Sequence, residues 1–295
     1  MHKILGLFPG QGSQAVGMAD DLVEKYLNFF ETANRVLNFD LLNLMTSGPQ
    51  EILTLTKWAQ PAILTVSFVK FQDLQQTEGL QLQNYACFVG HSLGELSALL
   101  CSGVLDFETA VFLAHKRGEF MQDAVPEGKG GMIALVGLLD KKVFELAEEN
   151  KVYVANFNSP EQVVFGGMWD NLNKFCESLK IHGSTVKIVP LRVSAPFHTP
   201  LLLPAKEKFS TLLETIALKL PQIPVISNVT ALPYPNDPIK IRELLSDQIV
   251  HSVLFKDCVH YAVENYYFEH FIEIGFGQIL TGLIKKNKFA ITAFK

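Results

Sequence analysis

Short apolar runs alternate along the chain with longer amphipathic segments. The runs at 4–8 and 85–89 are each followed by a glycine-containing turn, as is typical of buried strands. Between them, apolar residues recur at helical spacing over 18–37. A second helical pattern extends to about residue 76, with Pro61 expected in its first turn. Strands that alternate with helices predict a doubly wound, mainly parallel α/β sheet.

A different order of elements follows the polar, glycine-rich segment 126-PEGKGG-131. The pattern there predicts strand, helix, two strands, helix and strand, which is the order of a ferredoxin-like split motif. We therefore expect a large α/β hydrolase-like subdomain, residues 1–127 and 197–295, with a small ferredoxin-like (βαββαβ) subdomain, residues 128–196, inserted into it. Outside the helices and strands already named, the pattern predicts strands over 132–138, 152–156, 162–165, 185–189, 225–228 and 271–274, and helices over 93–101, 107–124, 141–150, 171–181, 202–219, 253–265 and 278–286.

Composition narrows the class of protein. The chain has 295 residues, 48% of them hydrophobic and 19% charged, and a formal net charge of -5, which argues against a nucleic-acid partner. The apolar run at the N-terminus is too short for a signal peptide or a membrane span, so we expect a cytoplasmic protein without a membrane partner. The cysteines are too far apart for a metal site or a disulfide framework, and we expect free thiols at Cys87, Cys101, Cys176 and Cys258.

The segment 90-GHSLG-94 places Ser92 between two glycines, after an apolar run and before an amphipathic one. Gly-x-Ser-x-Gly is the spacing of a sharp strand-to-helix turn that exposes the central hydroxyl. Ser92 is therefore a candidate nucleophile.

Arg117 lies near the middle of the apolar arc of the helix predicted over 107–124. A buried guanidinium needs a partner, because an unpaired buried charge costs several kcal/mol. Either a protein carboxylate pairs with it, or the arc faces a cavity in which a ligand anion does. If a ligand is the partner, the geometry of arginine favours a free carboxylate.

A serine nucleophile needs a base within hydrogen-bond reach. Among the eight histidines, His2, His115 and His182 are predicted on the surface. Chain position favours His198, in the proline-flanked loop SAPFHTPL, and His91 remains the alternative.

The oxyanion of an acyl transfer needs two donors. One is the backbone N–H of Leu93, the residue after the serine, and the loop 9-PGQGSQ-14 is placed to supply the other. This loop could instead bind a phosphate, but it lacks the usual glycine and lysine patterns of phosphate loops.

Seven motifs occur together in a known order: FPGQGSQ, GHSLGE, the helix with Arg117, NSPEQVVFGG, PFHTPL, ISNVTA and EIGFGQILTGL. They span nearly the whole chain, which resembles the malonyl-CoA:acyl carrier protein transacylases and the related acyltransferase domains of polyketide synthases. The resemblance implies transfer of malonyl from malonyl-CoA through an acyl-serine to the phosphopantetheine thiol of an acyl carrier protein, in fatty acid or polyketide biosynthesis.

The resemblance also implies residue roles. Ser92 would carry the acyl group, and His198 would be the base, oriented by a backbone carbonyl best matched by Gln248. The amides of Gln11 and Leu93 would form the oxyanion hole.

Arg117 would hold the malonyl carboxylate, and Phe197, with the small residue Leu93, would favour malonyl over branched acyl groups. The family works without a cofactor or metal. We expect a monomer with an acyl carrier protein as partner, for which Lys285, Lys286 and Lys288 are a candidate basic patch, although a solvated helix end explains them equally well.

Three alternatives stay open at this point. One is an acyl hydrolase of the same fold that edits carrier proteins, and another is a free-standing polyketide acyltransferase. The third is a carrier-binding module without activity, which the intact candidate residues argue against. We expect the chain to lack a secretion signal, so the sequon Asn228-Val229-Thr230 is not expected to be glycosylated.

Overall fold

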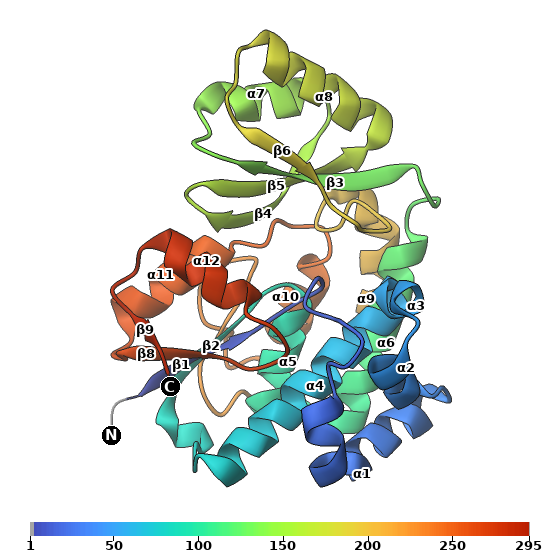
Figure 1. The fold of residues 1–295 in the computed structure, drawn as a ribbon, viewed down its shortest axis with the longest axis vertical. Coiled ribbons are helices and arrows are strands. Elements are labelled where there is room, and N and C mark those ends of the chain that lie inside the picture. Colours follow the sequence, from blue (N-terminus) through green and yellow to red (C-terminus); the bar gives the residue numbers. More distant parts are fainter. Residues whose placement is uncertain (1–2, 295) are drawn as a thin grey trace.

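Two separate sheets organise the chain, and the computed structural model describes them over residues 3–294 (Figure 1). The larger sheet has five strands in the order β7-β2-β1-β8-β9, and every pairing in it is parallel. This confirms the predicted parallel α/β sheet. Its strands are β1 (Ile4–Phe8), β2 (Tyr85–Gly90), β7 (Val225–Ile226), β8 (His270–Glu273) and β9 (Thr292–Ala293).

The central strand β1 is buried on both faces, which explains its continuous apolar sequence. Ile4 and Phe8 join a core with α4 (Thr56–Thr77) and α5 (Leu93–Cys101) on one side. Leu5 and Leu7 join a second core with α11 (Phe255–Asn265) and α12 (Ile279–Asn287) on the other. Helices on both faces are the doubly wound arrangement that the chain pattern predicts.

The smaller sheet has four antiparallel strands in the order β4-β5-β3-β6. Together with its two helices it gives the order βαββαβ, as predicted. We call this sheet with its two helices the small lobe and the rest of the chain the large lobe. One face of the sheet packs against the two helices, while Met132 and Val164 on the other face belong to the core of the large lobe. The elements are β3 (Gly130–Val136), α7 (Lys141–Glu149), β4 (Tyr153–Ser159), β5 (Gln162–Met168), α8 (Trp169–Ile181) and β6 (Lys187–Pro190).

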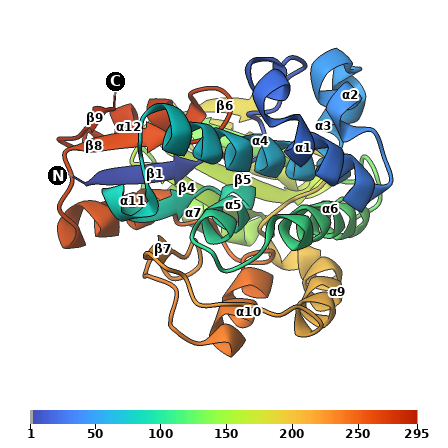
Figure 2. The same ribbon diagram turned by 90° about the horizontal axis from the view of Figure 1, so that it is seen from below.

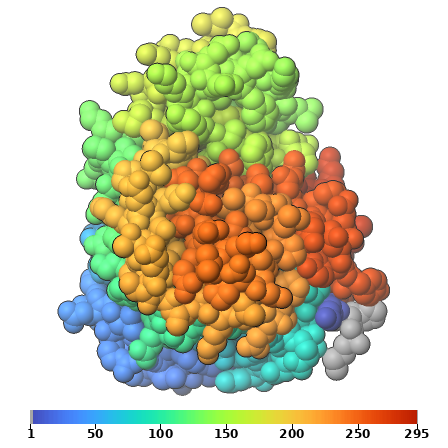
Figure 3. All heavy atoms as spheres, turned by 180° about the vertical axis from the view of Figure 1, so that it is seen from behind, coloured from blue at the N-terminus to red at the C-terminus, as the bar shows by residue number. Residues whose placement is uncertain are grey.

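Strand β4 joins the two lobes. The amide of Val253 donates to the carbonyl of Ala155 at 2.9 Å, and the amide of Phe157 donates to the carbonyl of Val253 at 2.9 Å. Figure 3 shows the lobes from behind, with the small lobe in green and yellow above the orange segment that follows it in the chain. The small sheet therefore forms a roof over one end of the large lobe.

The prediction that Pro61 lies in the first turn of its helix was wrong. Helix α4 begins at Thr56, so Pro61 lies inside it. A proline inside a helix leaves the carbonyl four residues earlier without its usual donor. Here that carbonyl belongs to Lys57, and it accepts a hydrogen bond from His115 Nδ1 at 2.9 Å. His115 is half-buried against Trp58, with ring centroids 4.9 Å apart, so its predicted surface position was also wrong.

The periodic pattern missed several short elements. Helices α2 and α3 have seven and five residues, too few to show an amphipathic repeat, and β9 has two. Helix α10 follows a start signal, Asp237 then Pro238, that could have been recognised. Figure 2 shows α1 and α2 on the opposite side of the large lobe from α9 and α10. The remaining bounds are α1 (Asp20–Leu37), α2 (Leu41–Ser47), α3 (Gln50–Thr54), α6 (Phe107–Asp123), α9 (Leu203–Glu214) and α10 (Pro238–Asp247).

Candidate active site

Ser92 sits at the tip of the turn between β2 and α5, with φ 53° and ψ -110°. The two glycines are required by close approach. A Cβ on Gly90 would overlap the backbone of Gly94 and Glu95, and a Cβ on Gly94 would overlap the carbonyl of Phe8 at the end of β1. The turn is thus pressed against the sheet, and the serine side chain points into the open space beyond the strand ends.

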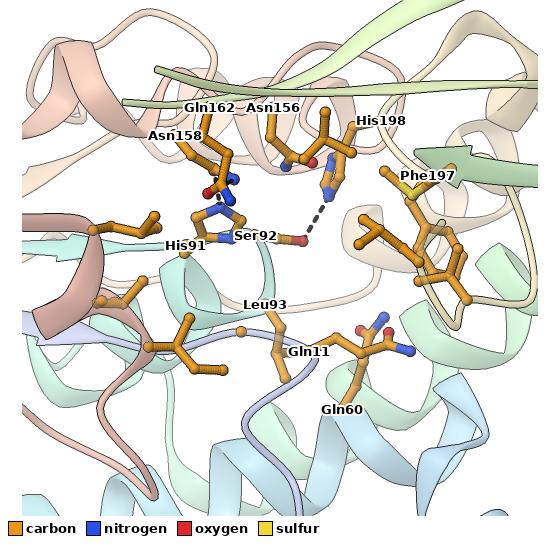
Figure 4. Close-up of a pocket in the computed structure, with 18 of the residues that line it drawn as sticks. Gln11, Gln60, His91, Ser92, Leu93, Asn156, Asn158, Gln162, Phe197 and His198 are labelled. Atoms are coloured by element: carbon orange, nitrogen blue, oxygen red, sulfur yellow. Dashed lines mark hydrogen bonds between the residues drawn. The ribbon is translucent and has the colours of Figure 1, made fainter. Parts of the chain in front are cut away.

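The structure brings Ser92 and His198 together. Ser92 Oγ lies 2.6 Å from His198 Nε2, and His198 Nδ1 lies 2.7 Å from the backbone carbonyl of Gln248 (Figure 4 shows the first contact). Because a carbonyl can only accept, Nδ1 carries the proton and Nε2 accepts from the serine hydroxyl. Burial and the nearby Arg117 charge lower the pKa of His198 to about 3, against the opposing effect of the Gln248 hydrogen bond. The imidazole is therefore neutral and able to take a proton.

His91, the alternative base, lines the same pocket but has a different partner. Its Nε2 lies 2.8 Å from Asn158 Oδ1, and Asn158 Nδ2 donates to Gln162 Oε1 at 3.3 Å. This polar row comes from the small sheet, and Figure 4 shows it above Ser92 together with Asn156. Asn158 and Gln162 belong to the motif NSPEQVVFGG, but the sequence pattern did not predict that they line the pocket.

Arg117 is 2% exposed, and neutral oxygens hold its guanidinium. Nη1 donates to Gln60 Oε1 and Nη2 to Gln248 Oε1, both at 2.7 Å, and Nη2 also lies 3.3 Å from Ser92 Oγ. Within residues 3–294 no carboxylate forms an ion pair with it. Burial lowers its pKa to about 10, so the group stays charged at neutral pH. The long 3.3 Å contact between Nη2 and Ser92 Oγ is the one that a ligand carboxylate at the serine could replace.

The pocket in front of Ser92 has the oxyanion candidates on one side. Figure 4 shows Gln11 and Leu93 below the serine. Leu93 is the first residue of α5, so its N–H has no acceptor within the helix. The Gln11 side chain donates to Thr56 Oγ1 at 3.3 Å. Phe197, only 5% exposed, forms another part of the wall and narrows the space beside the histidine.

Over the part of the chain that the structure describes, no three His, Cys, Asp or Glu side chains gather as a metal site would require. In the same residues, none of the helices has the length and apolar character needed to cross a membrane.

A parallel α/β fold with a serine and a neutral histidine in one pocket, and a buried arginine beside the serine hydroxyl, is the arrangement of a serine-dependent acyltransferase. The chain belongs to the acyl transferase domain family, whose match covers residues 7–288. It is 40% identical over 300 residues to the malonyl CoA-acyl carrier protein transacylase of Escherichia coli (strain K12), covering 99% of this chain and 95% of that protein. The resemblance inferred from the seven motifs is confirmed.

Solved structures agree with this membership. An acyl carrier protein S-malonyltransferase from Vibrio cholerae superposes with a TM-score of 0.92 at 39% identity, covering 99% of this chain and 97% of that one. A malonyl-transacylase solved in complex with a type II polyketide synthase acyl-carrier protein superposes with a TM-score of 0.93 at 36% identity, covering 99% and 94%.

Proposed function

We propose that the chain is a malonyl-CoA:acyl carrier protein transacylase that works through an acyl-serine. The observation that carries the proposal is the position of Ser92 Oγ, 2.6 Å from a neutral His198 Nε2 and 3.3 Å from Arg117 Nη2. A base and a carboxylate-binding cation thus meet at one hydroxyl. The printed names of the relatives support the same substrate and acceptor.

The reaction divides into two half-reactions at this hydroxyl. Ser92 Oγ attacks the thioester carbonyl while its proton passes to His198 Nε2, and the C–S bond of malonyl-CoA then breaks. The departing thiolate takes the proton back, leaving a neutral imidazole, a malonyl ester and free coenzyme A. The carrier thiol reverses these steps with the same histidine. The Gln248 carbonyl stabilises the imidazolium while it exists, in place of a carboxylate.

The other site residues stabilise charge or limit the size of the acyl group. The amides of Gln11 and Leu93 stabilise the oxyanion of each tetrahedral intermediate. Arg117 binds the free carboxylate of the malonyl group, and Gln60 and Gln248 orient its guanidinium from behind. Phe197 limits the room for a branch on the acyl group, a preference of about 1–3 kcal/mol for one methyl.

No resident cofactor or metal enters this scheme, because the thioester already carries the activation. One chain supplies every side chain named in the site, which supports a monomer. We place the enzyme in the cytoplasm, where it would serve fatty acid biosynthesis or, in the alternative reading, a polyketide assembly line.

Intact-protein mass spectrometry after mixing with malonyl-CoA tests the proposal. We expect one malonyl mass on Ser92 that moves to a phosphopantetheinylated carrier protein when it is added. Ser92→Ala should carry no adduct while remaining folded. An adduct that decays to free malonate at the same rate with and without the carrier would make the enzyme a hydrolase.

The role of Arg117 is tested in the same assay by a change of acyl group. Arg117→Ala should slow acylation by malonyl-CoA roughly 10- to 100-fold more than acylation by acetyl-CoA, because only malonyl has the carboxylate. Equal losses for the two thioesters would assign Arg117 a structural role instead.

A further inference from the structure

The backbone of the nucleophile turn has a support that the chemistry above does not use. Asn228, in the loop after β7, is fully buried and reaches both sides of the turn with one side chain. Its Oδ1 accepts from the backbone N–H of Ser92 at 2.8 Å, and its Nδ2 donates to the carbonyl of Gly90 at 2.8 Å. An amide is the side chain group that can accept and donate in this way without a charge.

Asn228 is itself fixed by a buried carboxylate one helical turn beyond the serine. Glu95 Oε2 accepts from the backbone N–H of Asn228 at 2.7 Å, and the hydroxyl of Tyr234 donates to Glu95 Oε1. Glu95 has no exposed surface. Burial raises its pKa to about 7, against these two hydrogen bonds and the Arg117 charge, which favour the ionised form. Such a group costs free energy to bury, so its place beside the turn calls for a function.

These contacts close a ring around the turn: from Ser92 along α5 to Glu95, then to Asn228, and back to the Ser92 amide. The ring encloses a strained residue, because a serine with φ 53° and ψ -110° persists only when its surroundings hold it. Gln248 adds a further hold, since its Nε2 donates to the Ser92 carbonyl at 3.0 Å and to Asn228 Oδ1 at 3.3 Å.

We propose that Asn228, held in place by Glu95, is a positioning residue that locks the strained backbone of the nucleophile turn and so keeps Ser92 Oγ in line with His198. The inference rests on the proposed role of Ser92 as the nucleophile. The same burial closes the sequon at Asn228 to glycosylation in the folded chain, because the side-chain amide is fully buried and bonded to Gly90.

The test separates rate from binding in single-turnover acylation by malonyl-CoA. Asn228→Ala should lower the maximal acylation rate about 10- to 100-fold, since a small misplacement of a reacting atom has effects of that size. The concentration of malonyl-CoA for half-maximal rate should change less than about 3-fold, because the substitution removes none of the hydrogen bonds that Arg117 itself makes. Gln248 loses its 3.3 Å bond to Asn228 Oδ1 but keeps those to Arg117 and to the Ser92 carbonyl. Glu95→Gln keeps the shape and an acceptor for the Asn228 amide, so it should show a smaller loss in the same parameter.

Asn150→Ala is the matched control. It removes an amide whose Nδ2 donates to the Leu146 carbonyl at 2.8 Å in the small lobe, remote from the turn. It should lower the urea midpoint without changing the acylation rate. A folded Asn228→Ala with the wild-type rate, or with weakened binding alone, would overturn the proposal. If that variant does not fold, Glu95→Gln decides, and a wild-type rate there would equally overturn it.

A serine-directed fluorophosphonate keeps this result separate from the proposed function, since it labels an activated serine without a malonyl group. Asn228→Ala should slow this labelling as well. If wild-type Ser92 reacts with the probe but never takes up malonyl, the substrate assignment fails while the positioning role stands. If the probe labels Asn228→Ala as fast as wild type, the positioning role fails.

Discussion

Ser92 and His198 share an unusual backbone conformation, with φ of 53° and 59°. Residues other than glycine rarely adopt positive φ, and each instance costs free energy that the rest of the fold must offset. The two residues that meet at 2.6 Å are thus held by their surroundings rather than by local preference. The same burial excludes water from the His198 imidazole and lowers its pKa. Packing around His198 therefore fixes both its position and its neutral state.

The neutral state of His198 leads to a prediction for the pH dependence of acylation. Its pKa is lowered from 6.5 to about 3, so the base stays unprotonated as the pH falls through 6.5. The second-order rate constant of acyl-Ser92 formation reports the free enzyme, and it should show no loss from His198 between pH 8 and pH 5. Quenched-flow mass spectrometry measures this rate.

Glu95 provides the control for that profile, because its pKa is raised to about 7 and its titration could change the turn. A fall in rate that disappears in Glu95→Gln belongs to the carboxyl. A fall with a midpoint near 6.5 that persists in Glu95→Gln would contradict the neutral, shielded histidine.

Arg117 and Glu95 are buried ionisable groups of opposite charge type, and the hydrogen bonds of the structure do not join them directly. The amide of Gln248 lies between them, accepting from Arg117 Nη2 at 2.7 Å and donating to Asn228 Oδ1 at 3.3 Å. When Glu95 is ionised, its negative charge raises the pKa of Arg117 against the larger effect of burial and so favours the charged guanidinium. A direct ion pair would compete with a substrate carboxylate, whereas a separated counter-charge leaves the remaining donors available.

At the scale of helices and strands, the sequence predicted the features that depend on residue periodicity and motif spacing. The alternation of strands and helices, and the place of Arg117 on an apolar helix face, are local patterns that the fold preserves. The contact between His198 and Ser92 joins residues 106 positions apart, and chain position alone could only favour it over His91. The ring through Asn228 and Glu95 could not be predicted, because it depends on a loop and a helix that only the folded sheet brings together.

In helix α4, a side chain from another helix supplies the hydrogen bond that a proline removes. His115 donates to the Lys57 carbonyl that Pro61 leaves without its helical partner. His115→Phe keeps an aromatic ring against Trp58 but removes the donor, so it should lower the free energy of unfolding by about 1–2 kcal/mol. Urea unfolding at pH 8 measures the loss, and His115→Gln, which can still donate, should recover part of it. An unchanged midpoint in His115→Phe would show that solvent satisfies the carbonyl equally well.

The whole molecule has two lobes whose cores are joined. Met132 and Val164 of the small sheet belong to the same core as α4 and α5, and β4 exchanges backbone hydrogen bonds with Val253. The pocket lies between these parts, with Ser92 on the large lobe and Asn158 on the small one. The shape of the pocket therefore depends on how the two lobes pack together, so a loss of that packing would also disrupt the site.

We predict that the two lobes unfold in one transition, although residues 128–196 form a sheet of their own. The chain has two tryptophans, Trp58 in α4 and Trp169 at the start of α8, one in each lobe. Trp58→Phe and Trp169→Phe therefore leave one fluorescent reporter per lobe. In each variant, the urea midpoint from fluorescence should equal the midpoint from far-ultraviolet circular dichroism. Separating the lobes would expose their shared core and break the hydrogen bonds between β4 and Val253, so the lobes should unfold together. A small-lobe reporter that changes at lower urea than the circular dichroism would show that the inserted part unfolds independently and that the pocket opens before the fold is lost.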